Sequence, residues 1–159
     1  MHFSELVPGT QLWPSFYASP AQLFQQLEQE TEWDTRMFSR KTASFGKAYN
    51  YSQITYPEQA FPATLASLLP AIEEVVGYCP NNCLINFYPE GSSRMGYHSD
   101  QVDILAPETG IGILSLGAER PLRFRNITSP ELHHDVLLPS GSLFHMSAKV
   151  QQHWQHALP

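Results

Sequence analysis

The chain is poor in cysteine and has no long apolar run. Its two cysteines, Cys79 and Cys83, have three residues between them and no second pair, which is too few for a disulfide framework or a structural zinc knuckle. We therefore expect reduced thiols in a cytoplasmic protein. No stretch reaches about 18 consecutive apolar residues, and the N-terminus has no basic segment followed by an apolar one, so we expect neither an export signal nor a membrane anchor.

Basic residues are outnumbered by acidic ones. Nine lysines and arginines stand against fifteen aspartates and glutamates, so the formal net charge is -6. This balance provides no general attraction to a phosphate backbone and argues against a protein that coats nucleic acid. Hydrophobic residues make up 42% of the chain and charged residues 15%, a globular composition that argues against wholesale disorder.

What the chain does contain is enough sequence for one folded domain. Its 159 residues can bury a hydrophobic core, and we expect a single domain over residues 1–159 that is a monomer. Thirteen prolines and nine glycines are typical of many short strands joined by turns. The sequence shows no internal repeat, low-complexity tract or linker.

Two helical regions are predicted in the first half of the chain. Residues 1–18 are expected to be irregular, and a helix is predicted to begin at Ser19–Pro20, where a serine cap precedes a proline in the first turn. A second helical region follows Pro62 and stops at Gly77. Because Pro70 interrupts it, we expect a kink or two consecutive short helices.

Short strands are predicted from residue 42 onward. The patterns are short, rich in β-branched and aromatic residues, and bounded by turn residues. Helices first and strands afterwards favour an α+β fold in which helices brace one face of a β-sandwich. The predicted strands cover residues 42–45, 49–51, 83–87, 111–116, 122–125, 136–138 and 142–146.

One short motif combines residue types that bind metals. His98 and Asp100 are two positions apart, so on an extended backbone both side chains point to the same face. A second imidazole from a distant strand would complete a two-histidine, one-carboxylate site with open positions for a cosubstrate and O2. The tripeptide alone does not establish such a site, because it arises often by chance and a solvated surface pair is the ordinary alternative.

The residue types leave the third ligand open. Five histidines follow Asp100, and the period of two in a strand does not choose among them. They are His133, His134, His145, His153 and His156.

A series of motifs around this tripeptide resembles the AlkB family of oxidative dealkylases. The motifs occur in the family's order over residues 42–159 and agree with one another. They are Leu84-Ile85-Asn86-Phe87-Tyr88-Pro89-Glu90-Gly91, Met95-Gly96-Tyr97-His98-Ser99-Asp100, Leu114-Ser115-Leu116-Gly117-Ala118-Glu119-Arg120 with Phe124-Arg125, Pro139-Ser140-Gly141-Ser142-Leu143, Met146, and Gln152-His153-Trp154-Gln155-His156-Ala157-Leu158-Pro159.

The resemblance implies a fold, cofactors and site residues. The implied fold is α+β, with a double-stranded β-helix (jelly-roll) core and N-terminal helices packed on one face. Fe(II) is the implied metal, with 2-oxoglutarate and O2 as cosubstrates. Matched motif by motif, His98, Asp100 and His156 are the iron ligands and catalytic residues.

Three further positions receive roles from the resemblance. Asn86 and Tyr88 match an Asn-x-Tyr pair that lines the 2-oxoglutarate pocket, and Tyr51 matches an aromatic residue that helps to hold the substrate base. Without the neighbouring metal motif, Asn86 and Tyr88 would be interpreted as a turn-flanking asparagine and a core tyrosine. Tyr51 is equally well interpreted as an ordinary strand aromatic.

The implied reaction is oxidative dealkylation. An N-alkyl C–H bond is hydroxylated, and the product then releases an aldehyde. The expected substrate is an alkylated DNA or RNA base, including bases in single strands, and the expected process is repair. Alternatives are an oxygenase acting on a protein or small-molecule substrate, a jelly roll that binds metal without oxidation, and a zinc hydrolase with the same ligands.

The sequence departs from the family in two places. The family's next motif, a strand with an arginine that clamps 2-oxoglutarate, would follow Pro159, so we expect the sequence to lack that last strand. Incompleteness of the chain, another cation or loss of turnover would each account for this. Family members that repair duplexes carry acidic residues directly after the His-x-Asp motif, where this chain has Gln101 and Val102, with Asp103 one step later.

Overall fold

The computed structural model describes residues 5–51 and 54–159, with residues 49–51 described by their backbone. The chain divides into two compact units, each of which is described below by itself. The first unit combines Met1–Gln25 with Arg94–Pro159, and the second is Gln26–Ser93.

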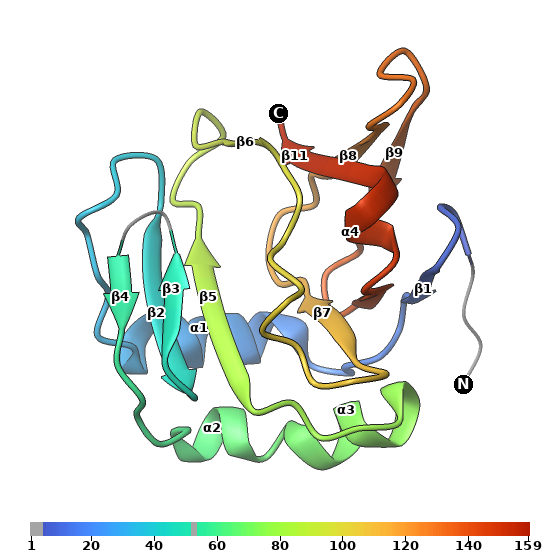
Figure 1. Ribbon diagram of the computed structural model, residues 1–159. Helices are drawn as coiled ribbons and strands as arrows, with labels where there is room; N and C mark the ends of the chain where they lie inside the picture. Colours follow the sequence, from blue (N-terminus) through green and yellow to red (C-terminus); the bar gives the residue numbers. More distant parts are fainter. Residues whose placement is uncertain (1–4, 52–53) are drawn as a thin grey trace. The chain divides into compact units, whose positions relative to one another are not determined.

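Short strands dominate the order of elements (Figure 1). The helices and strands, in chain order, are β1 (Thr10–Trp13), α1 (Pro20–Glu30), β2 (Lys41–Gly46), β3 (Tyr49–Tyr51), β4 (Ile54–Tyr56), α2 (Ala63–Ala66), α3 (Leu69–Val76), β5 (Asn82–Phe87), β6 (Met95–His98), β7 (Gly110–Leu114), β8 (Pro121–Asn126), β9 (His133–Leu137), β10 (Leu143–Ser147), α4 (Val150–His153) and β11 (Trp154–Leu158).

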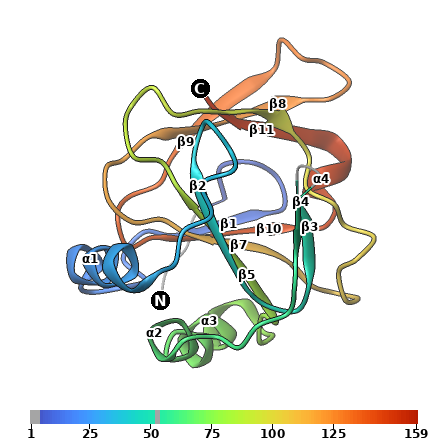
Figure 2. The ribbon, with the colours of Figure 1, turned by 90° about the vertical axis from the view of Figure 1, so that its left-hand side faces the viewer.

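The first unit contains two antiparallel sheets. One has three strands in the order β1-β10-β7, and the other has four in the order β6-β11-β8-β9. Figure 2 shows them as separate layers, with β8 and β11 in one and β1, β7 and β10 in the other. Only β8 and β9 are both paired and consecutive in the chain; the other paired strands of these sheets lie far apart in the sequence, so the unit depends mainly on long-range pairing.

A continuous hydrophobic core draws residues from both sheets of this unit. Phe124 on β8 and Phe144 on β10 are fully buried, and their ring centroids lie 5.9 Å apart. Burial of such apolar side chains is the main stabilising contribution to a fold of this kind. The buried members of the core are Val7, Leu12, Leu122, Phe124, Val136, Leu138, Phe144, Met146, Val150 and Trp154.

The second unit is built from two-stranded ladders and two short helices. β2 pairs with β5 over six residues, from Lys41 opposite Phe87 to Gly46 opposite Asn82. β3 pairs with β4. The helices α2 and α3 follow, and α3 ends at Gly77, which adopts a left-handed φ of 89°.

The predicted helices are confirmed. A helix begins at Pro20, and the region after Pro62 forms two consecutive helices. Pro70 lies in the first turn of α3, where its missing N–H has no helical partner to lose, so the chain can start a new helix there but cannot continue the earlier one. Among the described residues, none of the helices combines the length and apolar character needed to cross a membrane.

The predicted strands are also present, but the prediction for residues 1–18 is wrong. This segment contains β1, which pairs with β10 and places Leu12 opposite Phe144. Strands β4, β6 and β11 were not predicted either. β6 and β11 carry histidines and a glutamine in place of regular apolar alternation, so their sequences lack the usual strand pattern.

Candidate metal centre

Two strands and one turn bring His98, Asp100 and His156 together. His98 ends β6 and lies directly opposite His156 on β11, while Asp100 follows β6 by two residues. His98 Nε2 is 3.4 Å from Asp100 Oδ1, and His156 Nε2 is 3.5 Å from Asp100 Oδ2. One ligand atom from each residue lies within 4.8 Å of the other two.

These distances fit a shared cation. Metal–nitrogen and metal–oxygen bonds of about 2.1 Å at right angles place neighbouring ligand atoms about 3 Å apart. The two separations between a histidine nitrogen and a carboxylate oxygen of Asp100 exceed this by only a few tenths of an ångström, and all three ligand atoms lie within 4.8 Å of one another. Two imidazoles and one carboxylate therefore stand close enough together to share a divalent metal, with one side of the coordination sphere left to other ligands.

His98 is oriented by its own strand. Its Nδ1 lies 2.9 Å from the carbonyl oxygen of Gly96. A proton on Nδ1 donates to that carbonyl and leaves the Nε2 lone pair facing Asp100, which is the usual way in which a second contact orients a metal-binding histidine. The side chain of His98 remains 27% exposed.

His156 is held by packing. Its side chain is 3% exposed, and its ring lies 5.6 Å from that of Phe124, which faces it across the β11–β8 ladder. Its Nδ1 is buried without a hydrogen-bond partner. Burial lowers the pKa of His156 to about 4, so the ring is neutral at physiological pH and has a lone pair available for a metal.

Asp100 lies outside the strand but is tied to the segment that carries His156. Its backbone N–H donates to Gln151 Oε1 at 2.7 Å. The neighbouring Ser99 hydroxyl donates to the carbonyl oxygen of Trp154 at 2.8 Å. Both partners precede His156 by no more than five residues, so one short segment carries one candidate ligand and contacts the turn that carries another.

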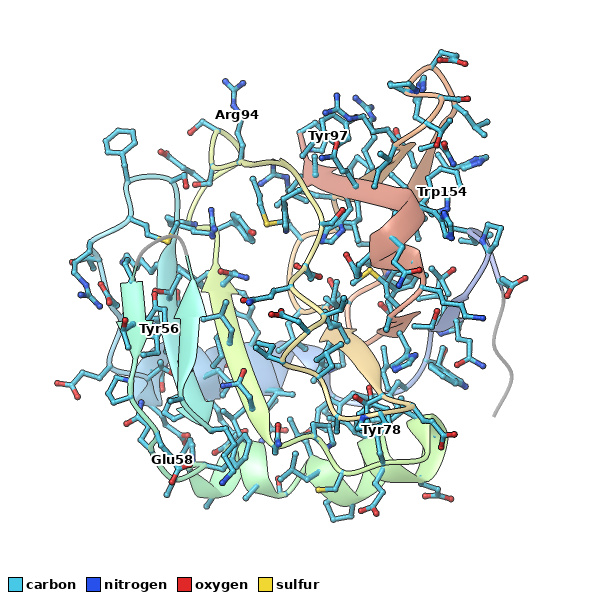
Figure 3. All side chains as sticks on the ribbon, in the orientation of Figure 1. Tyr56, Glu58, Tyr78, Arg94, Tyr97 and Trp154 are labelled. Atoms are coloured by element: carbon cyan, nitrogen blue, oxygen red, sulfur yellow. The ribbon has the colours of Figure 1, made fainter. Side chains whose placement is uncertain are left out.

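The outer face of the same sheet carries a second set of contacts. The guanidinium of Arg125 lies 4.0 Å from the ring centroid of Tyr97 and donates twice to Gln155 Oε1, at 3.0 and 2.9 Å. Figure 3 marks Tyr97 and Trp154 toward opposite ends of β11. These contacts connect β6, β8 and β11 on the face opposite the metal ligands.

The other residues that the sequence suggested for the site lie outside the triad or in the second unit. Within the described residues, none of the other four candidate histidines belongs to a group of three possible ligands. Asn86 and Tyr88 belong to the second unit, where the Asn86 amide oxygen accepts a hydrogen bond from Arg40 at 3.1 Å. Their role in 2-oxoglutarate binding stays a prediction. The side chain of Tyr51 lies outside the described residues.

Two arginines at or just before β8, Arg120 and Arg123, form hydrogen bonds within the first unit. Arg120 donates to the carbonyl oxygen of Pro159 at 2.8 Å. Arg123 forms a two-point pair with Asp135 at 2.7 and 3.0 Å, which raises the pKa of Arg123 and lowers that of Asp135.

Comparison with known proteins agrees with this site. The family model described as the 2OG-Fe(II) oxygenase superfamily matches residues 16–159. The chain belongs to the 2OG-Fe(II) oxygenase superfamily. Membership implies an Fe(II)- and 2-oxoglutarate-dependent dioxygenase, and the His98, Asp100 and His156 group fits the metal that such an enzyme needs.

Sequence relatives confirm the AlkB-like character of this 2OG-Fe(II) oxygenase. It is 31% identical to DNA oxidative demethylase ALKBH2 of Mus musculus over 89% of the chain and 69% of the relative, and 31% identical to its Homo sapiens counterpart over 89% and 63%. Alpha-ketoglutarate-dependent dioxygenase alkB homolog 3 of Rattus norvegicus is 31% identical over 86% of the chain and 53% of the relative. The chain thus spans between about half and two thirds of these relatives.

A solved structure supports the predicted fold class. The structure of OsALKBH1 matches with a TM-score of 0.72, covering 99% of this chain and 87% of that one at 17% identity. The oxygenase described here therefore has the α+β jelly-roll fold that its motifs predicted.

One residue beside the metal ligands was not predicted from the sequence. Gln151 contacts the backbone of Asp100, yet a glutamine in a polar stretch carries no sign of such a role. Its position five residues before His156 could have drawn attention only once His156 was known to be a ligand.

Proposed function

We propose that this oxygenase removes N-alkyl groups from nucleic-acid bases, using His98, Asp100 and His156 as its iron ligands. The observation that carries the proposal is the direct register of His98 with His156, with Asp100 within 3.5 Å of both imidazoles. The relatives named as DNA oxidative demethylases provide the substrate class.

Each ligand contributes a different property. The two imidazoles would donate lone pairs to the metal, and the carboxylate of Asp100 would offset part of the charge of a divalent cation. When bound, Fe(II) and 2-oxoglutarate supply the oxidation, in which O2 is consumed, succinate and CO2 are formed and a substrate C–H bond is hydroxylated.

Burial distinguishes the two sides of the centre. The side chains of His98 and Asp100 are 27% and 17% exposed, whereas His156 is 3% exposed and lies against Phe124. The core therefore closes the His156 side to water, and cosubstrate and substrate approach from the side of His98 and Asp100. Exclusion of water from the inner side protects the reaction from unproductive side chemistry.

Single strands are the favoured form of the substrate. The net charge of -6 provides little general attraction to a duplex, and Gln101 and Val102 are neutral at the positions that follow the metal motif. Recognition of an unpaired base avoids the cost of extracting it from a stacked helix.

The experiment is a turnover assay with matched variants. Fe(II)-loaded protein is incubated in air with 2-oxoglutarate and an oligonucleotide carrying N-methylated bases, as a single strand or as a duplex, and succinate and formaldehyde are measured. We expect substrate-dependent formation of both products, faster with the single strand. His98→Ala should reduce turnover at least about 1,000-fold because it removes a ligand, whereas His133→Ala, at an exposed position outside the triad, should not.

Three results would contradict parts of the proposal. Full activity in His98→Ala would exclude the ligand assignment. Succinate formation that no methylated oligonucleotide stimulates would exclude nucleic acid as the substrate class but would still show oxygenase activity. A faster reaction with duplex would exclude the preference for single strands.

A further inference from the structure

The backbone of Asp100 has no strand to hold it in place. β6 ends at His98, so the ladder that fixes His98 opposite His156 does not extend to the carboxylate ligand. A metal-binding carboxylate needs a defined position, because its oxygens must meet the cation together with both imidazoles.

Gln151 supplies a contact at this point. Its Oε1 accepts the backbone N–H of Asp100 at 2.7 Å, a short and direct hydrogen bond. Gln151 belongs to α4, is 5% exposed, and is one of the few polar side chains buried in the described part of the chain.

Both ends of the Gln151 amide are engaged. Nε2 lies 3.4 Å from the sulfur of Met146, and Met146 is a fully buried member of the hydrophobic core. The core therefore fixes the amide from one side while the amide fixes Asp100 from the other. A buried polar group is usually retained only when it has hydrogen-bond partners, and here each end of the amide has one.

The same segment also carries a ligand. Gln151 precedes His156 by five residues, and α4 leads directly into β11. A shift of this segment would move His156 and the support of Asp100 together, which keeps the distance between the two ligands constant.

We infer that Gln151 is a positioning residue for the metal centre, holding the carboxylate of Asp100 where it can bind the same metal ion as both histidines. The inference rests on the proposed metal site and adds a residue that touches neither metal nor substrate. Loss of such an outer contact typically weakens metal affinity about 10- to 100-fold.

The test measures Co(II) binding by the full chain, with Co(II) as an air-stable probe for Fe(II). Gln151→Leu removes the acceptor at similar volume, and Gln151→Glu keeps an acceptor oxygen. Gln152→Leu and Gln152→Glu are matched controls at the exposed neighbouring position. Affinity is obtained by titration, the ligand field from the visible Co(II) spectrum, and folding from thermal unfolding of the metal-free proteins.

We expect Gln151→Leu to weaken Co(II) binding at least about 10-fold and to shift the Co(II) spectrum, and Gln151→Glu to stay within about threefold of the wild type. The two Gln152 variants should match the wild type. If Gln151 only filled space, Gln151→Leu would disturb Co(II) binding less than Gln151→Glu, because burying leucine is tolerated and burying a carboxylate is not.

Several results overturn the inference. Co(II) binding by Gln151→Leu within threefold of the wild type contradicts it, as does a folded Gln151→Glu that has lost Co(II). If Gln151→Leu does not fold, the Gln151→Glu result alone decides. Wild-type protein that binds no Co(II), or His98→Ala that binds it fully, contradicts the metal centre itself and the inference with it.

Discussion

The two units differ in how their buried side chains are packed. In the first unit, Phe124, Phe144 and Val136 are inaccessible to solvent and belong to one continuous core. In the second unit, β2 has three buried residues, but its partner β5 is half-buried along all six residues and α3 has no fully buried residue. Two-stranded sheets of this kind are marginal without further packing.

This difference bears on where each part of the site is found. The candidate metal ligands gather in the unit with the tight core, where backbone positions are defined by packing on both sheets. The residues expected to bind 2-oxoglutarate, Asn86 and Tyr88, lie on or just after the half-buried β5. Tight packing suits the ligands of a metal, and the part of Asn86 and Tyr88 in binding the cosubstrate stays a prediction.

The largest effect on stability and metal binding is expected from a substitution in the core of the first unit. Phe124→Ala should lower the free energy of unfolding by about 3–5 kcal/mol, because it leaves a cavity at a fully buried site. It should also weaken Co(II) binding, since the ring supports His156. Chemical denaturation and Co(II) titration measure the two effects.

Leu65→Ala, in the second unit, is the control for this prediction. Leu65 is buried in α2, so its loss should also destabilise the protein while Co(II) affinity stays unchanged. Equal weakening of Co(II) binding by both variants would mean that the two units respond as a single cooperative body.

A smaller effect is expected from Asn86→Ala. If Asn86 lines the 2-oxoglutarate pocket, the half-saturating concentration of 2-oxoglutarate should rise about tenfold, equivalent to about 1.4 kcal/mol, with Co(II) affinity unchanged. Asn82→Ala, on the same strand, should leave both values unchanged, although it removes contacts to Phe45 and Lys47. An unchanged 2-oxoglutarate requirement in Asn86→Ala would remove this residue from the pocket.

The smallest expected effect is a difference in chemical reactivity between the two thiols of the second unit. Burial raises the pKa of Cys83 to about 11, whereas Cys79 is exposed. At pH 8 only about one Cys83 thiol in a thousand is ionised, and the thiolate is the reactive form. Iodoacetamide should therefore label Cys79 in the native protein and both cysteines in denaturant, as measured by mass spectrometry.

The sign of this pKa shift also predicts a pH dependence. Because the folded protein holds the Cys83 proton more tightly than the unfolded chain, this contribution to stability is complete below about pH 8.5 and is lost as the pH rises toward 11. In the labelling experiment, equal rates for Cys79 and Cys83 of the native protein at pH 8 would show that Cys83 on β5 is open to solvent.

Local sequence signals predicted much of the secondary structure. The helix at Pro20, the break at Pro70 and the stop at Gly77 follow from the geometry of proline and glycine, which acts within a few residues. Except for β4, whose partner β3 lies next to it in the chain, the missed strands have the opposite character. β1, β6 and β11 are stabilised by partners up to more than a hundred residues away, and no local pattern contains that information.

The candidate ligands show the same division. His98 and Asp100 were identified from their spacing, because two residues on an extended backbone share a face. His156 was one of five histidines until the resemblance to AlkB proteins selected it, and the residue types alone could not have done so. Gln151 was missed because its contact with Asp100 depends on how α4 meets the turn after β6.

The sequence by itself determined the kind of protein: the residue types of the candidate metal site, the motifs that assign it to the AlkB-like oxygenases, and the local starts and stops of its helices. Only the tertiary structure decided the strand register that sets His156 opposite His98, the contact of Gln151 with Asp100, and the burial of His156 by the core. The physical reason is range: backbone preferences and motif chemistry act between near neighbours in the chain, whereas strand register and burial are set by contacts between distant segments.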